Sequence, residues 1–243
     1  MLTPRPRVAV LFSRRCPGLE NLLWGHRRRE FDLVCGLTTS DEGLTARAPM
    51  ARLRIPLIPH LIHPFVSARG LGLSDMAARR DYDRATAARL APYRPDLVLL
   101  ASYLYILTDP ILEAFPGRIA NVHGSDLART RPDGRPLYPG LSAVRDAIRA
   151  GEAETRATAH VVTERLDDGP ILLRSRPFAV SPLVAELRRG GNLHAVNAYA
   201  YAHEEWMLAT AWGPLLTGAI PRLCSTGART DDRPPALAVG ARA

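Results

Sequence analysis

Short apolar runs alternate with amphipathic stretches along most of this chain. The apolar runs have the length of buried strands, since about four to eight apolar residues between turn residues are typical of a sheet interior. Strands are predicted at Arg7–Phe12, Phe31–Leu37, Ile55–Ile58, Asp96–Ala101, Arg118–Val122, Ala157–Thr163 and Ile171–Phe178. Helices are predicted at Leu19–Arg29, Asp75–Leu90, Leu141–Ala150 and His194–Trp212. The alternation predicts an α/β fold, with a Rossmann-like, mostly parallel twisted sheet flanked by helices.

Turn and capping residues mark several ends of these elements. Ser74-Asp75 is expected to open the helix that runs to about Leu90, and Pro92 and Pro95 mark its end. Gly213-Pro214 is expected to stop or interrupt the last helix. Beyond Thr226 the chain is polar and contains prolines, a composition typical of disorder. The expected organisation is therefore one domain over residues 1–225 and a disordered tail over 226–243.

Composition narrows the classes of function. No apolar run approaches the roughly 18 residues of a membrane span, and the first one is too short for a signal peptide, so a cytoplasmic protein without a membrane partner is expected. The net charge is +8, and every one of the 32 basic residues is arginine. These arginines are dispersed and no RNA-binding motif accompanies them, so a small anionic ligand is favoured over nucleic acid.

Cysteine and histidine spacings do not favour a metal site. Cys16, Cys35 and Cys224 share no close spacing, so neither a disulfide framework nor a zinc knuckle is predicted. His60 and His63 are three residues apart, but prolines flank them and no acidic partner is near in sequence. We predict a loop there, and no bound metal.

Two polar motifs form the candidate chemistry. Asn121-Val122-His123 closes one apolar strand, and Ser102-Tyr103 follows another, so both lie at the sheet edge where open α/β sheets bind ligands. Asp167 opens a turn further along the chain. An amide or imidazolium can stabilise the negative charge that develops when an amine attacks a formyl carbon. A carboxylate can orient the imidazole and help to take the amine's proton. This set of side chains therefore makes formyl transfer chemically possible at this edge of the sheet.

Residues 7–180 resemble the folate-dependent formyltransferases, specifically the catalytic domain shared by glycinamide ribonucleotide and methionyl-tRNA formyltransferases. The resemblance rests on Tyr82-Asp83-Arg84, Pro95–Ala101, Tyr103–Leu107, Gly117–Ser125, Tyr138-Pro139-Gly140 and Thr158–Leu172. It implies the formyltransferase fold and 10-formyltetrahydrofolate as formyl donor. The acceptor is expected to be a small-molecule amine, and the protein a monomer or a homodimer.

The resemblance also assigns roles to residues. Asn121 would donate to the formyl oxygen, His123 would stabilise the oxyanion or act as general acid, and Asp167 would be their carboxylate partner. Asp168 is read as a turn residue. His160 would either support the site from behind or be a core histidine. The residues expected to hold the pterin are Tyr103, Leu104, Tyr105, Ile106, Leu107, Val162, Thr163 and Leu166.

The acceptor half of the site departs from the family pattern. Arg14 and Arg15 stand where the ribonucleotide enzyme has a Gly/Asn/Ser phosphate loop, and Pro17 removes one N–H from that loop. A longer segment, residues 126–137, contains Arg129, Arg131 and Arg135. These five arginines are predicted to contact an acceptor that is anionic.

Two alternatives to transfer stay open. One is hydrolysis of the formyl donor, with water in place of the amine. The other is a silent folate- or nucleotide-binding protein. The aromatic residues Tyr199, Tyr201, Trp206 and Trp212 are assigned to the core or to a dimer face, since their helical spacing suits packing.

Overall fold

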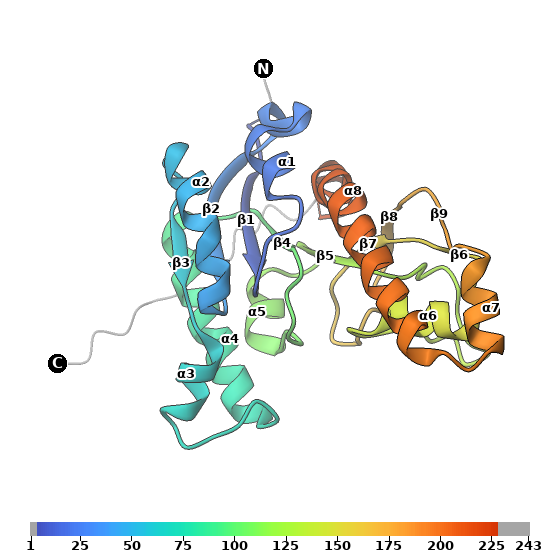
Figure 1. Ribbon diagram of the computed structural model, residues 1–243. Helices are drawn as coiled ribbons and strands as arrows, with labels where there is room; N and C mark the ends of the chain where they lie inside the picture. The colour runs from blue at the N-terminus through green and yellow to red at the C-terminus, as the bar shows by residue number, and fades with distance from the viewer. Residues whose placement is uncertain (1–3, 228–243) are drawn as a thin grey trace.

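A seven-stranded sheet forms the centre of the structure, a computed structural model that describes residues 4–227 (Figure 1). The strand order is β3-β2-β1-β4-β5-β7-β8. Strands β1 to β5 run parallel, whereas β7 is antiparallel to β5 and β8 is antiparallel to β7. The bounds are β1 Arg7–Phe12, β2 Asp32–Thr38, β3 Leu57–Pro59, β4 Leu97–Leu100, β5 Ile119–His123, β7 Thr158–Val161 and β8 Ile171–Arg174. The predicted mostly parallel α/β fold is confirmed.

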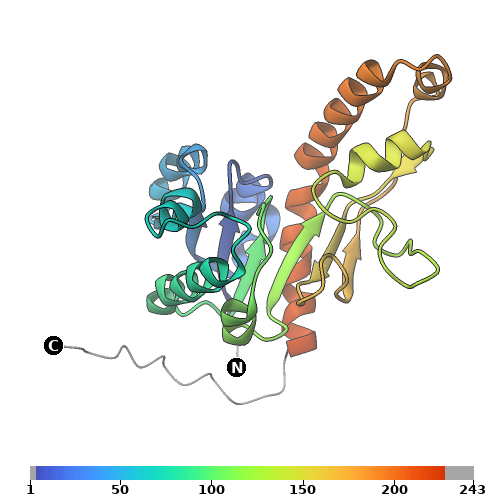
Figure 2. The same ribbon diagram turned by 90° about the horizontal axis from the view of Figure 1, so that it is seen from below.

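Helices cover both faces of this sheet, as Figures 1 and 2 show. The bounds are α1 Leu19–Trp24, α2 Arg47–Arg52, α3 Ile62–Ser67, α4 Met76–Leu90, α5 Asp109–Ala114, α6 Ala143–Ala150, α7 Leu183–Arg189 and α8 Leu193–Gly227. Apolar residues of α1, α6 and α8 pack on one face of the sheet, and those of α4 and α5 pack on the other. Asp75 lies at the start of α4, as predicted, and its side chain caps the helix by accepting a hydrogen bond from the amide of Ala78. None of the helices in residues 4–227 is both long and apolar enough to cross a bilayer.

Three predicted boundaries are wrong for local reasons. The helix predicted at Leu19–Arg29 ends at Trp24, because Gly25 adopts an extended conformation and residues 26–30 continue as a 3₁₀ helix. His60 and His63 are not in one loop, since α3 starts at Ile62. The strand predicted at Ile171–Phe178 is two strands. Its end is β9 (Phe178–Ala179), which pairs with β6 (Glu154–Thr155) in a separate small sheet.

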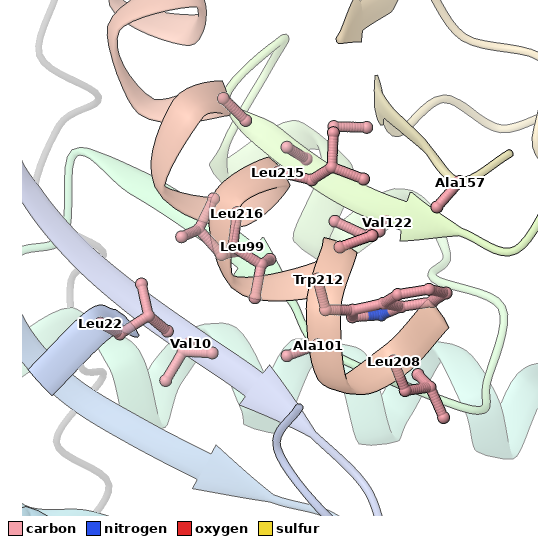
Figure 3. Close-up of a cluster of buried hydrophobic side chains, with 14 of the residues drawn as sticks. Val10, Leu22, Leu99, Ala101, Val122, Ala157, Leu208, Trp212, Leu215 and Leu216 are labelled. Atoms are coloured by element: carbon pink, nitrogen blue, oxygen red, sulfur yellow. The ribbon is translucent and has the colours of Figure 1, made fainter. Parts of the chain in front are cut away.

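The last helix is longer than predicted. Gly213-Pro214 neither stops nor interrupts α8, which continues through Pro214 and Pro221. A proline inside a helix costs about 3 kcal/mol, so other contacts must offset the two prolines. Figure 3 shows Leu208, Trp212, Leu215 and Leu216 of α8 facing sheet residues such as Leu99 and Val122. This burial on both sides of Pro214 keeps the helix in place. Residues 228–243, most of the predicted tail, lie outside the described residues.

The glycine of this pair has a packing role. A Cβ at Gly213 would lie 1.9 Å from the Asn21 side-chain oxygen, and a Cβ at Gly18 would lie 2.6 Å from the Gly213 Cα atom. The backbone of α8 therefore approaches α1 and the loop before it more closely than any side chain allows. This contact holds α8 beside the loop that carries Arg14 and Arg15.

His60 makes the stability of the fold dependent on pH. Its Nδ1 atom lies 3.0 Å from the Thr86 hydroxyl, and its ring stacks on Tyr82 with centroids 4.0 Å apart. Within residues 4–227 its Nε2 atom is buried without a hydrogen-bond partner. Burial, with smaller effects of Arg89 and Arg69, lowers the pKa of His60 to about 3. The folded protein therefore holds this imidazole neutral.

We expect stability to fall as the pH drops below about 6.5, the ordinary histidine pKa, because only the unfolded chain then binds the proton. The loss from His60 should be about 1.4 kcal/mol per pH unit, continuing toward pH 3. Urea unfolding at a series of pH values measures it. His60→Phe should remove this component of the slope, whereas His63→Phe, at an exposed position, should keep it. An unchanged slope in His60→Phe would contradict the assignment.

Candidate active site

A cavity of about 500 Å³ opens at the carboxyl ends of β4 and β5. Its walls are the loop after β1, residues 102–107, residues 140–144, residues 160–167 and the middle of α8. The size is that of a site for a small-molecule ligand. The cavity lies at the edge of the sheet formed by the carboxyl ends of the parallel strands, beside the end of β5. The sequence predicted the site at this edge.

Most of the residues selected from the sequence meet in this cavity. Asn121, His123 and Asp167 line it, together with all eight residues expected to hold the pterin. Arg14 and Arg15 line it too. Arg129, Arg131 and Arg135 are not among its lining residues.

Asn121 is oriented by the strand beside it. Because β7 is antiparallel to β5, His160 pairs with Asn121 across the sheet, and Asn121 Nδ2 lies 3.3 Å from His160 Nε2. His160 Nδ1 lies 3.0 Å from the Val161 carbonyl, so it carries the proton and Nε2 accepts. Burial lowers the pKa of His160, with Asp167 opposing the shift, and this favours the neutral imidazole. One amide hydrogen of Asn121 is thus used by His160 and the other is free for a ligand.

Asp167 is held in a conformation that few residues adopt. Its φ of +54° is left-handed, a region that aspartate tolerates better than most side chains. Its Oδ2 atom accepts from the Gly140 amide at 2.7 Å and lies 3.5 Å from His123 Nδ1. Gly169 makes this turn possible, since a Cβ there would lie 1.8 Å from the Val161 carbonyl oxygen. Ser102, also on the cavity wall, has a φ of +54° as well, so strained backbone gathers at this site.

His123 has an acceptor at each ring nitrogen. Its Nε2 atom lies 2.9 Å from the Tyr138 carbonyl oxygen, which also accepts from the Ser125 hydroxyl at 2.8 Å. Its Nδ1 atom faces Asp167. Only the doubly protonated imidazolium can donate to both neighbours. The two ring nitrogens of His123 thus each face an acceptor, and Asp167 is close enough to exchange a proton with the imidazole beside Asn121.

The cavity wall formed by residues 102–107, which we call the apolar half, is mostly apolar and is held in place by hydrogen bonds. Its rim exposes Ile106 (51%), Leu141 (70%) and Leu166 (51%), large side chains that normally bury. Ser13 accepts from the Leu104 amide at 3.1 Å, and Asp83 accepts from the amide and hydroxyl of Thr108, each at 2.7 Å. These bonds fix both ends of the segment that lines this wall.

Charged side chains reach the cavity from the loop after β1 and from Glu204 of α8, which together we call the charged half. Arg15 forms a bidentate pair with Glu205, and Arg14 lies 3.2 Å from Glu42. Glu204, which sequence reasoning missed, also lines the cavity. Burial, and then Glu205, raises the pKa of the Glu204 carboxyl. The helical spacing could have identified Glu204 as a cavity residue. Glu204, Leu208 and Trp212 are spaced four residues apart, so they share the helix face that lines this cavity.

The arginine-bearing segment 126–137 folds back on itself, and in Figure 2 it extends away from the sheet. The Arg131 amide donates to the Arg135 carbonyl at 2.8 Å, and Gly134 takes a φ of +81° at the tip. Arg129 pairs with Glu152, and Arg135 lies 3.6 Å from Asp133. The three arginines of the segment thus bind partners within the segment or the neighbouring Glu152. Within residues 4–227, no group of three or more His, Cys, Asp and Glu side chains is arranged to hold a metal ion.

Comparison with known proteins agrees with this geometry. Residues 7–182 match the family model described as formyl transferase. The chain is 33% identical over 111 residues to phosphoribosylglycinamide formyltransferase from Escherichia coli K12, covering 46% of this chain and 49% of that protein. It is 29% identical over 170 residues to formyltetrahydrofolate deformylase from the same strain, covering 70% of this chain and 53% of that protein. The chain thus spans about half the length of these relatives.

A solved structure gives the same result for the fold. Glycinamide ribonucleotide transformylase 1 from Symbiobacterium toebii superposes with a TM-score of 0.60 at 28% identity, over 82% of this chain and 86% of that chain. The family match spans β5, which carries Asn121 and His123, and the turn between β7 and β8, which carries Asp167. The chain belongs to the formyl transferase family.

Proposed function

We propose that this protein transfers a formyl group from 10-formyltetrahydrofolate to a small-molecule amine. One observation carries the proposal: Asn121, His123 and Asp167 converge on a ligand-sized cavity with an apolar half and a charged half. The apolar half suits the flat ring system of a folate, and the charged half suits a polar acceptor. The relatives named formyltransferase and deformylase support the choice of donor.

The residues of the apolar half fit the donor. Tyr105, Ile106 and Leu166 would cover the faces of its ring system, while backbone groups of residues 104–107 and 162–167 would hydrogen-bond to its edges. When bound, the donor supplies a formyl carbon that an amine can attack.

Asn121 would donate its free amide hydrogen to the formyl oxygen as negative charge develops there. His123 lies between the Tyr138 carbonyl and Asp167, and its imidazolium form would add positive charge near the same oxygen. Asp167 is placed to accept the proton that the attacking amine loses as its nitrogen bonds to the formyl carbon. The bond between the formyl carbon and the donor nitrogen then breaks, and Asp167 would return a proton to that nitrogen.

The part of the site that would bind the acceptor is less well defined than the part that would bind the donor. Arg14 and Arg15 are proposed to contact it, but each already has a carboxylate partner and Glu204 adds negative charge. The Arg14–Glu42 pair is exposed, so its disruption costs little and Arg14 is the more available of the two cations. An acceptor with one anionic group, together with hydroxyl or amine groups that Glu204 can bind, fits this arrangement.

Hydrolysis of the donor is the second candidate. The deformylase relative is aligned over 70% of this chain, so the proteins that this chain resembles include a hydrolase of the donor as well as transferases. In that reaction a water molecule would occupy the position of the amine, and Asn121, His123 and Asp167 would keep their roles.

One experiment separates these functions. Purified protein is incubated with 10-formyltetrahydrofolate and panels of phosphorylated, carboxylated and hydroxylated amines, and mass spectrometry detects addition of one CO unit to an amine. We expect donor-dependent formylation of at least one panel by the wild type and none by His123→Ala. Formate release that no amine alters would establish hydrolysis. Folate binding without loss of formyl from the donor would overturn both enzymatic functions.

A further inference from the structure

Residues 138–140, which we call the strap, touch both members of the His123–Asp167 pair. The Tyr138 carbonyl accepts from His123 Nε2 at 2.9 Å, and the Gly140 amide donates to Asp167 Oδ2 at 2.7 Å. Gly140 adopts a φ of +78°, and the strap leads directly into α6. Backbone groups of one short segment therefore set the positions of both side chains.

The strap is anchored outside the cavity by a side-chain network. The Tyr138 hydroxyl donates to Glu152 Oε1 at 2.7 Å, and Arg129 binds both oxygens of Glu152, one of them at 2.8 Å. The Glu152 side chain is 20% exposed. Arg129 lowers the pKa of Glu152, and burial raises the pKa of Tyr138 to about 12, so the charged acceptor and the protonated donor persist across the neutral range.

Glu152 and Arg129 do not touch the substrate cavity. Their connection to it runs through the Tyr138 ring to the Tyr138 carbonyl, and so to His123. Charge-assisted hydrogen bonds are stronger and better defined in direction than neutral ones, so Glu152 restricts the strap more than a neutral contact would.

We propose that Glu152 is a positioning residue that acts through Tyr138, holding the strap so that its carbonyl and amide orient His123 and Asp167 for formyl transfer. The proposal rests on the function proposed above. It gives Arg129 and the segment 126–137 a role in organising the site, in place of direct contact with the acceptor. The same network would fix which nitrogen of His123 carries a proton, since the Tyr138 carbonyl demands a proton on Nε2.

The test compares Tyr138→Phe, Glu152→Ala and Glu152→Gln with the wild type. A misplaced catalytic group commonly costs about 100-fold, so we expect Tyr138→Phe and Glu152→Ala to lower kcat by about 10- to 100-fold with an unchanged KM for the donor. Glu152→Gln keeps an oxygen acceptor for the Tyr138 hydroxyl and should recover most of that loss. Combining Glu152→Ala with Tyr138→Phe should be no worse than either alone, because both break one interaction.

Two further measurements distinguish positioning from a merely structural role. The ¹⁵N shifts of the His123 imidazole, assigned by comparison with His123→Ala, should show loss of the fixed Nε2–H state in Tyr138→Phe and Glu152→Ala. Glu154→Gln, which removes only the exposed partner of Arg156, is the matched control and should match the wild type in kcat and in ¹⁵N shifts.

The results that would refute the positioning role of Glu152 differ from those that would refute the proposed function. A wild type that removes no formyl group from the donor refutes the proposed function. An active wild type, with Tyr138→Phe and Glu152→Ala unchanged in kcat and in the His123 ¹⁵N shifts, refutes the positioning role alone. A loss of kcat that tracks a fall in Tm, with unchanged ¹⁵N shifts, also refutes it.

Discussion

Replacing Asn121 by alanine is expected to lower kcat by about 100- to 1,000-fold, the usual effect of removing one hydrogen-bond donor from a developing oxyanion. Asn121 lines the cavity and its amide nitrogen is held by His160, so its loss removes a pre-aligned donor without creating a new charge. Initial rates with saturating donor and the best acceptor from the amine panels give kcat.

Folding and donor binding are the controls for Asn121→Ala. The side chain is half-buried on the cavity wall, so Tm and the Kd for a folate ligand should both stay near the wild-type values. A variant that keeps its kcat would remove Asn121 from the mechanism. A variant that loses folate binding would instead assign Asn121 to the donor site.

Asp167→Asn is expected to lower kcat by roughly 1,000-fold, while Asp168→Asn leaves kcat within about twofold. The two residues are adjacent, which makes them a matched pair. Asp167 faces His123 and accepts from Gly140, whereas Asp168 pairs with Arg165 and does not line the cavity. The asparagine at position 167 keeps an oxygen for the Gly140 amide but removes the negative charge beside the imidazole.

The pH dependence of kcat supplies a second readout for this pair of variants. Wild type and Asp168→Asn should share one profile, and Asp167→Asn should depart from it, because only Asp167 faces the imidazole of His123. Equal effects of the two substitutions on kcat would show that the turn, and not the carboxylate of Asp167, is what the site requires.

The fold was predictable because buried parallel strands are continuous apolar runs. The strand Arg7–Phe12 has the bounds predicted for it, and all its residues after Arg7 are buried. The errors come from contacts that a local pattern does not contain. Gly213-Pro214 resembles a helix stop in sequence, yet distant apolar partners and the contact with Asn21 carry α8 through it.

In the site, too, local sequence patterns predicted some residues, whereas contacts between distant segments determined others. Asn121 and His123 were predictable as site residues, since both lie at the end of one buried strand. The role of the Tyr138 carbonyl could not be predicted. Every residue has a backbone carbonyl, and the sequence does not show which of them lies beside His123. The partners of the arginines were also hidden: Arg15 and Glu205 are 190 residues apart in sequence, and only the path of α8 brings them together.

The path of α8 has a consequence for how the chain acquires its structure. This helix is the last element described, yet it supplies Val196, Met207, Leu215, Ile220 and Leu223 to the core that the first strand also enters. During synthesis the sheet therefore emerges from the ribosome with one apolar face covered only in part, by α1 and α6, until α8 follows. Such long-range closure slows folding and leaves an aggregation-prone surface for a time. The protein should consequently depend on chaperones more than a domain built from local contacts.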